Sequence, residues 1–308
     1  MNFLIVGLVK NEQVLRLQDE AKKSGHTVDG CNSFDLVLNF NPNYRRHSER
    51  SEESPFNYYL EGLDINSYDV IYLCVVGNRR WDWYLAMQDL SKKGVKIVNI
   101  KVVDTSYNLL YTAGADYKKQ LETEIPFPRS TVFFHHKSIP KILQNYTFPL
   151  ILKVSSEGKM RKGRGVFLIK DVTELKRIVK ENYKEAHRLT LREFIPNDGD
   201  IRIFTVGYKA IGAMHRMAKE GDFRSNISQG GTGEEFDLDK NPKVKEIAEQ
   251  VSALTRTEIA GVDIMLHKET GDPYVLEVNF GPQFLGLEQY TRTNAALEII
   301  KYFESLTS

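Results

Sequence analysis

The chain has 308 residues, of which 41% are hydrophobic and 27% charged, and its formal net charge is +1 at pH 7. This balance gives no electrostatic bias toward nucleic acid or a membrane surface, and the sequence lacks the apolar run of about eighteen residues that a membrane span needs. Two cysteines are too few for a disulfide framework or a zinc cluster, so we expect a cytoplasmic, multi-lobed protein with no nucleic-acid or membrane partner.

The first part of the chain alternates strand-like and helix-like patterns. Strand-like runs occur at residues 3–9, 36–40, 70–76 and 95–100, and helical patterns occur at 12–23 and 81–93. Such alternation is typical of βαβ units in a parallel sheet, so residues 1 to about 105 are predicted to form a small α/β domain. A dinucleotide-binding domain is the alternative, but the turn that begins at Gly7 lacks the Gly-x-Gly-x-x-Gly pattern that brings backbone against a pyrophosphate.

Residues 41–58 differ from the sequence around them. The segment is polar and mixed in charge and contains almost no aliphatic side chain. Because such a segment cannot easily bury itself, we predict an inserted or mobile loop. Its arginines leave a second interpretation open, in which they hold an acidic partner.

A new segment begins at residue 125 with Ile-Pro-Phe-Pro and has the size of a lid. It carries a helical pattern at 138–144, strand patterns at 150–154 and 165–169, and a second helical pattern at 174–183. Lys153 ends the first strand, and the loop at 155–165 combines glycines with four Lys or Arg side chains. Glycine lets backbone N–H groups close on phosphate oxygens, so this loop is predicted to be a phosphate flap, with a basic turn in solvent as the alternative. It is not a P-loop, because no Gly-Lys-Ser/Thr opens a helix after the strand.

Strands dominate the remainder of the chain. They are predicted at 190–195, 201–206 and 210–217, followed by a helix at 244–255, a hairpin and a final helix at 294–305. Asp200 lies seven residues after Glu193, a spacing that can present main-chain groups to a base and a carboxylate to a ribose. The segment 215–231 concentrates planar donors that bind phosphates and carboxylates, with an exposed basic loop as the alternative.

The predicted hairpin brings three oxygen-bearing side chains together. Residues 259–266 and 274–278 are rich in β-branched and apolar residues, and the turn chemistry between them centres near Thr270-Gly271. Folding about that centre sets Asp263 opposite Glu277, and Asn279 lies on the same face because side chains alternate along a strand. This donor set suits Mg²⁺, which is usually completed by water and substrate phosphates. A solvated hairpin face with scattered acids is the alternative.

Five features, taken in chain order, resemble the ATP-grasp superfamily, and most closely its RimK-type carboxylate–amine (alpha-L-glutamate) ligases. They are Lys153, the flap at 155–165, the acidic segment at 193–200, the arginine-rich loop at 215–231 and the hairpin. The resemblance covers residues 126–306 and is most specific at 216–226, 260–263 and 276–279. It implies an α/β ATP-grasp fold with α+β lobes. The implied domains are an N-terminal Rossmann-like pre-ATP-grasp domain (1–124), a central lid (125–189) and a C-terminal antiparallel-sheet domain with the metal site (190–308).

The resemblance also implies roles for individual residues. Those expected to bind ATP are Lys153, Ser156, Gly158, Gly163, Gly165, Arg192, Glu193, Phe194, Ile195, Asp200 and Lys219. Those expected to face the γ-phosphate and an acyl phosphate are Arg216, Arg224 and Asn226. Two Mg²⁺ ions, with Mn²⁺ as an alternative, would be held by Asp263, Glu277 and Asn279. The family also places a lysine before the lid, for which Lys118 and Lys119 are both candidates.

The implied activity is ATP-dependent formation of an amide through an acyl phosphate, with release of ADP and phosphate. Its partners would be an amino acid, with L-glutamate as one candidate, and a carboxylate-bearing peptide, protein or metabolite. Family members are often dimers or tetramers, so a homo-oligomer is one expectation. The alternatives are a nucleotide-binding regulatory protein without turnover and a phosphotransferase. Two features depart from the pattern of the family. The flap is longer and more basic, and Gly281-Pro follows Asn279 where the family tends to have Ser-Pro-Gly.

Overall fold

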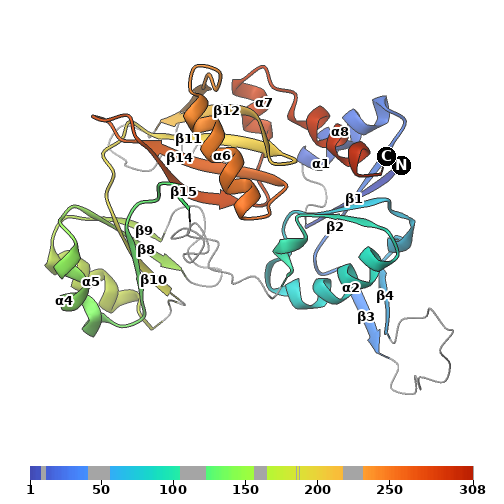
Figure 1. Cartoon of the computed structure of the whole chain (residues 1–308). Helices are drawn as coiled ribbons and strands as arrows, with labels where there is room; N and C mark the ends of the chain where they lie inside the picture. The colour runs from blue at the N-terminus through green and yellow to red at the C-terminus, as the bar shows by residue number, and fades with distance from the viewer. Residues whose placement is uncertain are drawn as a thin grey trace.

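The computed structural model of the chain describes most of its residues. The described ranges are 1–7, 12–40, 56–104, 123–155, 165–184, 186, 188–217 and 232–307. They form three main sheets and one short two-stranded ribbon (Figure 1). None of the helices in these ranges is long and apolar enough to cross a membrane.

The first sheet is parallel, as the alternating pattern predicts. Its strands are β1 (Asn2–Val6), β2 (Thr27–Cys31), β5 (Val70–Leu73) and β6 (Lys96–Val98), in the order β2-β1-β5-β6. Alternate residues of β1 face opposite sides: Phe3 packs with α1 (Glu12–Lys23), whereas Leu4 packs with α2 (Arg80–Lys92). Because both faces are covered, the two central strands β1 and β5 are almost continuously apolar.

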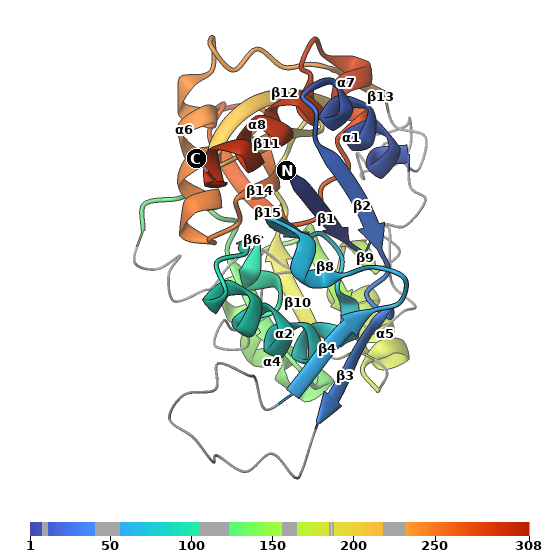
Figure 2. The same cartoon turned by 90° about the vertical axis from the view of Figure 1, so that its right-hand side faces the viewer.

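The strand at residues 36–40 forms as expected, but it does not belong to the parallel sheet. This strand, β3 (Leu36–Phe40), pairs antiparallel with β4 (Phe56–Leu60) in a separate ribbon that projects from the first sheet in Figures 1 and 2. The place beside β1 is taken by β2, which sequence reasoning missed because Asp29 and Gly30 have low strand propensity. The pairing of β2 with β1 therefore outweighs the low strand propensity of Asp29 and Gly30.

The second sheet, here called the small sheet, is antiparallel. Its strands are β7 (Ser130–Phe133), β8 (Leu150–Ser155), β9 (Val166–Ile169) and β10 (Arg188–Glu193), in the order β7-β10-β8-β9. One face buries Leu152 and Leu191 against α4 (Ile139–Ile142) and α5 (Val172–Asn182). The other face carries polar side chains, because residues alternate along each strand.

The helix expected at 138–144 is shorter than predicted. Only α4 is α-helical there, and 3₁₀ turns at His136–Ser138 and Leu143–Asn145 flank it. By contrast α5 begins sharply, because the Asp171 carboxylate accepts hydrogen bonds from the N–H groups of Thr173 and Glu174.

The third sheet, here called the large sheet, is also antiparallel. Its strands are β11 (Asp200–Val206), β12 (Lys209–Met217), β13 (Thr232–Glu235), β14 (Ile259–Leu266) and β15 (Pro273–Asn279), in the order β13-β12-β11-β14-β15. The helix α6 (Pro242–Leu254) covers one face of this sheet. On the other face, α7 (Leu285–Tyr290) and α8 (Ala295–Thr307) pack against β11 and β12.

One apolar core connects the large sheet to the parallel sheet. Phe303 of α8 touches Phe3 of β1 with ring centroids 5.2 Å apart, and α8 lies beside α1, so both ends of the chain meet (Figure 1). The parallel sheet and α1 therefore pack with the large sheet, α7 and α8 as one continuous unit.

Candidate functional site

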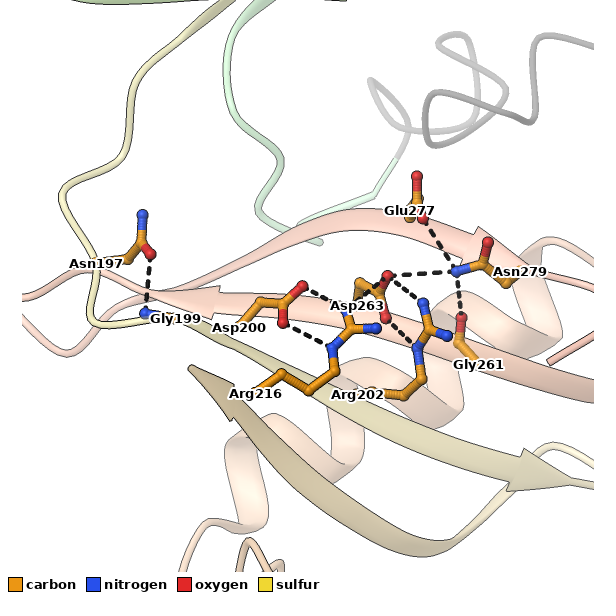
Figure 3. A network of polar contacts seen from close by, with 9 residues as sticks. All are labelled: Asn197, Gly199, Asp200, Arg202, Arg216, Gly261, Asp263, Glu277 and Asn279. Carbon is orange, nitrogen blue, oxygen red and sulfur yellow. Dashed lines mark hydrogen bonds and ion pairs between the residues drawn. The ribbon is translucent and has the colours of Figure 1, made fainter. Parts of the chain in front are cut away.

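The hairpin register predicted from the sequence is confirmed. Asp263 of β14 lies directly opposite Glu277 of β15, and Gly261 lies opposite Asn279, with a register irregularity between Asp263 and Ile264. The Asn279 side chain contacts both of the other predicted ligands, Asp263 and Glu277 (Figure 3). Its Nδ2 donates to Asp263 Oδ2 at 3.3 Å, to Glu277 Oε1 at 3.2 Å and to the Gly261 carbonyl at 3.3 Å. The three side chains therefore converge on one face of the large sheet.

Two arginines surround Asp263, whose side chain is only 4% exposed. Arg202 lies directly across from it on β11 and donates from Nε at 2.7 Å and from Nη2 at 2.6 Å, one bond to each carboxylate oxygen. Arg216 Nη2 lies 3.1 Å from Asp263 Oδ2. Burial alone would raise the pKa of Asp263, but the two guanidinium groups outweigh it and hold that pKa well below its usual range.

Arg216 also pairs with Asp200, which lies opposite it on β11. Its Nε donates to Asp200 Oδ1 at 2.8 Å and its Nη2 donates to Oδ2. Although burial opposes the charged form, the two carboxylates raise the pKa of Arg216 further above its usual value. Gly199 precedes this pair with φ +128°, and a Cβ there would lie 2.2 Å from the Arg216 carbonyl oxygen, so only glycine fits. We call Asp200, Arg216, Asp263 and Arg202 the charge row (Figure 3).

The polar face of the small sheet supplies the other side of the site. Lys153 on β8 lies across from Thr190 on β10. Arg192, next on the same face, donates from Nε to Ser130 Oγ at 3.0 Å and from Nη1 to the carbonyl of Leu276 at 3.2 Å. Because Leu276 precedes Glu277 on β15, this second bond ties the small sheet to the strand that carries the predicted metal ligands.

Lys153 and Thr190 have unmet electrostatic or hydrogen-bonding requirements. Burial, with a contribution from Arg192, lowers the pKa of Lys153 to about 8, while Glu277, Asp263 and Asp200 act in the opposite direction. Thr190 is only 1% exposed, and within the described residues its hydroxyl has no hydrogen-bond partner. A ligand with phosphate oxygens would satisfy both groups.

The oxygen-bearing side chains at and around Asp263 suit a divalent cation that completes its coordination with other ligands. Asp263, Glu277 and Asn279 together offer two carboxylates and one amide oxygen. In the part of the chain that the structure describes, no three acidic, histidine or cysteine side chains gather so as to hold a metal by themselves. Mg²⁺ commonly uses one or two carboxylates and completes its octahedron with water and phosphate oxygens. The chemistry of this donor set therefore fits Mg²⁺ bound together with a nucleotide.

The residues from Arg192 to Ile195, which are expected to bind ATP, lie at the end of β10 and just after it. The Glu193 carboxylate accepts from the N–H of Arg129 at 2.6 Å, Ile195 is buried and Phe194 is partly buried. Gly165 immediately precedes β9, and its carbonyl accepts from the N–H of Val154 at 2.7 Å. These residues lie at the small-sheet edge of the site, where the sequence expectation places the nucleotide.

Several predicted residues lie outside the described ranges. They are Ser156, Gly158 and Gly163 of the flap; Lys219, Arg224 and Asn226 of the arginine-rich loop; the candidates Lys118 and Lys119; and most of the predicted insertion at 41–58.

Sequence reasoning missed two members of the site. Arg202 belongs to the charge row, and its signal was the alternation in Asp200-Ile-Arg202, which puts both charges on one strand face. Thr190 stands opposite Lys153, but no local pattern distinguishes it from an ordinary strand threonine. Both assignments require knowing which strands are neighbours.

Comparisons with known proteins identify the family and the fold of the chain. Residues 105–303 match the family model of the RimK-like ATP-grasp domain. The chain is 28% identical over 305 residues to a protein of Vibrio vulnificus (strain YJ016) named probable alpha-L-glutamate ligase, with 96% of this chain and 94% of that protein covered.

Two solved structures show the same overall fold. The ATP-grasp ligase PsnB, in complex with a phosphomimetic variant of minimal precursor, Mg and ADP, matches with a TM-score of 0.71 at 15% identity, covering 99% of this chain and 98% of that chain. The macrocyclase MdnC of Microcystis aeruginosa MRC, bound with precursor peptide MdnA, matches with a TM-score of 0.63 at 13% identity, covering 99% of this chain and 100% of that chain. The predicted ATP-grasp fold is thereby confirmed.

Proposed function

The chain belongs to the RimK-like ATP-grasp family, and we propose on that premise that it is an ADP-forming carboxylate–amine ligase. In the proposed reaction, a substrate carboxylate oxygen attacks the γ-phosphorus of ATP, giving an acyl phosphate and ADP. An amine nitrogen then attacks the acyl carbon, which forms the amide and expels phosphate. The observation that carries the proposal is the charge row facing Lys153, an arrangement suited to phosphoryl transfer.

The charge row suits a reaction that depends on positioning and charge stabilisation. Arg202 and Arg216 are each held by carboxylates in fixed orientations, so their guanidinium groups need little reorganisation when negative charge develops nearby. Lys153, once paired with phosphate, would keep its proton. Together with Arg224 and Asn226 from the arginine-rich loop, these groups would stabilise both transition states without a dedicated nucleophile.

Mg²⁺ belongs to the proposal together with ATP, which the family uses. Asp263, Glu277 and Asn279 would hold it, and we assign two ions to the site. When bound, Mg²⁺ supplies positive charge beside the phosphates. The chain's own contribution is to keep Asp263 ionised through its two arginines, so that no proton competes at that carboxylate.

The proposed substrates are an amino acid and a carboxylate on a peptide, with L-glutamate as the first amine to test. The name of the Vibrio relative supports glutamate, and the precursor-bound PsnB and MdnC support a peptide. We also propose the division into lobes at 1–124, 125–189 and 190–308. Most of one main sheet falls in each range, although β10 (Arg188–Glu193) of the small sheet crosses the boundary at 189/190 and α8 packs back on the first lobe.

The test is ADP release by the purified protein with ATP and Mg²⁺, across the twenty amino acids, alone and with a glutamate-ended peptide. Products would be identified by mass spectrometry. An amide formed together with ADP is the expected result. ADP with a phosphorylated product and no amide would indicate a phosphotransferase, whereas ATP binding without ADP under any pairing would favour a regulatory protein.

Glu277→Gln is the matched loss-of-function variant for this test. The amide oxygen of glutamine can still accept the bond from Asn279, so the fold should remain intact, but a neutral amide is a poorer ligand for a hard cation. We expect ADP release to fall by about 100-fold or more, in line with the loss of a transition-state electrostatic contact. Wild-type turnover by a correctly folded Glu277→Gln protein would remove the metal assignment.

A further inference from the structure

The open end of the metal-binding hairpin is closed by a side chain from the parallel sheet. Gly261 opposite Asn279 is the last paired position of β14 and β15, and beyond it the chain turns away at Phe280. The Asn99 side chain lies there. Its Nδ2 donates to the carbonyls of Ile259 at 2.9 Å and Phe280 at 3.0 Å, and its Oδ1 accepts from the N–H of Ile259 at 3.1 Å. The carboxamide thus joins the two strands where their own ladder ends.

Asn99 is unusual in both its backbone and its burial. It follows β6 with φ 59° and ψ 34°, the left-handed conformation that asparagine tolerates better than most residues, and it is 1% exposed. Its own N–H donates to Glu258 Oε2 at 2.8 Å, next to Ile259. An amide with both a donor and an acceptor is needed here, because the three backbone groups that it satisfies have opposite polarity.

The loop that follows Asn279 has further ties to the parallel-sheet unit. A Cβ added to Gly281 would lie 2.5 Å from the carbonyl oxygen of Cys74, so this glycine permits close backbone approach. The N–H of Phe284 donates to Gln13 Oε1 at 2.8 Å. The segment that follows β15 is therefore held by contacts with residues outside the large sheet.

This external support acts unequally on the three predicted ligands. Asp263 is held independently by Arg202 and Arg216. Asn279 is at the last paired position of β15, one residue before Phe280. Its contact with Glu277 is a single hydrogen bond of 3.2 Å. Loosening the end of the hairpin would therefore move Asn279 and Glu277 more than Asp263.

We propose that Asn99 is a positioning residue for the metal site, which sets Asn279 and Glu277 at the end of the hairpin from the opposite lobe. This inference rests on the proposed function, because it concerns the Mg²⁺ that accompanies ATP. It gives the N-terminal lobe a part in nucleotide–metal binding, although the three assigned ligands all lie in the C-terminal lobe.

The experiment compares two variants of the full-length chain. Asn99→Gly removes the carboxamide and retains a residue that accepts the left-handed backbone. Arg16→Met is the matched control, because Arg16 donates three side-chain hydrogen bonds, two of them to Glu288 and Asn294 across the same pair of lobes but beside α7 and α8. Mn²⁺ binding to each protein saturated with ADP is measured by electron paramagnetic resonance, and thermal unfolding is measured in parallel.

We expect Asn99→Gly to weaken Mn²⁺ binding by about 10-fold or more, the effect typical of groups that orient metal ligands. The control Arg16→Met is expected to change Mn²⁺ binding by less than about twofold, while lowering the unfolding temperature comparably. If Asn99→Gly does not fold, Asn99→Asp is used, because it retains the acceptor for Ile259 and loses both donations.

An Asn99 variant that binds Mn²⁺ no more weakly than Arg16→Met overturns the positioning role and leaves the proposed ligase function standing. Wild-type protein that binds neither Mn²⁺ with ADP nor ATP itself overturns the proposed function and this inference together. The wild-type measurement therefore separates the two failures.

Discussion

The charge row and the pair formed by Lys153 and Thr190 face the same site but differ in how completely they are satisfied. Each charge of the row has an opposite charge within hydrogen-bonding distance. Lys153 instead has a lowered pKa, and the Thr190 hydroxyl makes no hydrogen bond within the described residues. The charges of the row are therefore balanced by folding alone, whereas Lys153 and Thr190 are the groups that the proposed nucleotide would complete. Mutations on the two sides should consequently have opposite effects on stability.

The largest expected effect on stability is that of Asp263→Asn. The variant removes the charge that two arginines share and leaves their buried guanidinium groups undercompensated. We expect a loss of about 3–5 kcal/mol in the free energy of unfolding, measured by urea denaturation. The control is Asp198→Asn, which breaks an exposed ion pair with Lys268 and should cost less than about 1 kcal/mol. Equal losses in both variants would contradict the account of the charge row.

Lys153→Met tests the other side of the comparison. Removing a cation whose pKa is already depressed by burial should leave the free energy of unfolding unchanged or raise it. ATP affinity should fall by about 10- to 100-fold, because a charge-assisted contact to phosphate is lost. Titration calorimetry with ATP measures this change, and Lys170→Met, at an exposed position after β9, is the matched control. A strongly destabilised Lys153→Met protein would show that Lys153 is structural.

The pH dependence of ATP binding should follow the ionisation of Lys153. Its pKa of about 8 in the folded protein lies below the ordinary value, so the side chain is charged below that pH and neutral above it. ATP affinity should therefore decrease as the pH rises from about 7 to about 9. Lys153→Arg should flatten this decrease, because arginine stays charged throughout. An identical decrease in wild type and in the arginine variant would assign the pH dependence to another group.

The smallest effect is expected for Thr190→Val. The substitution preserves shape and removes a buried hydroxyl that has no partner among the described residues, so stability should be unchanged or raised by up to about 1 kcal/mol. Thr257→Val is the contrast, because its buried hydroxyl bonds to both Thr255 oxygens and should cost about 1 kcal/mol. Unfolding in urea shows whether each substitution raises or lowers the free energy of unfolding. Equal destabilisation would mean that the Thr190 hydroxyl is satisfied in solution.

The hairpin of β14 and β15 was predictable because its information is local. Turn residues near Thr270 and strand residues on either side determine a register that places Asp263 opposite Glu277, and the structure has that register. The parallel sheet was also recognisable from its periodicity. The assignment of residues 36–40 to that sheet was wrong, because local pattern shows that a strand exists without showing which strand it pairs with.

The remaining features depend on contacts between distant parts of the chain. Arg202 meets Asp263 only because β11 and β14 are neighbours, and Asn99 reaches Phe280 only because the parallel sheet packs against the end of β15. No local pattern identifies the partner of either residue, since their roles arise from burial and hydrogen bonding between elements far apart in sequence.

The sequence by itself therefore determined the ATP-grasp resemblance, the hairpin and the shared face of Asp263, Glu277 and Asn279, because alternation and turn chemistry act over a few residues. Only the tertiary structure decided which arginines neutralise Asp263, which lobe closes the hairpin and which polar groups need a ligand. These depend on how strands pair and on which polar atoms become buried, and both are settled when the sheets pack together.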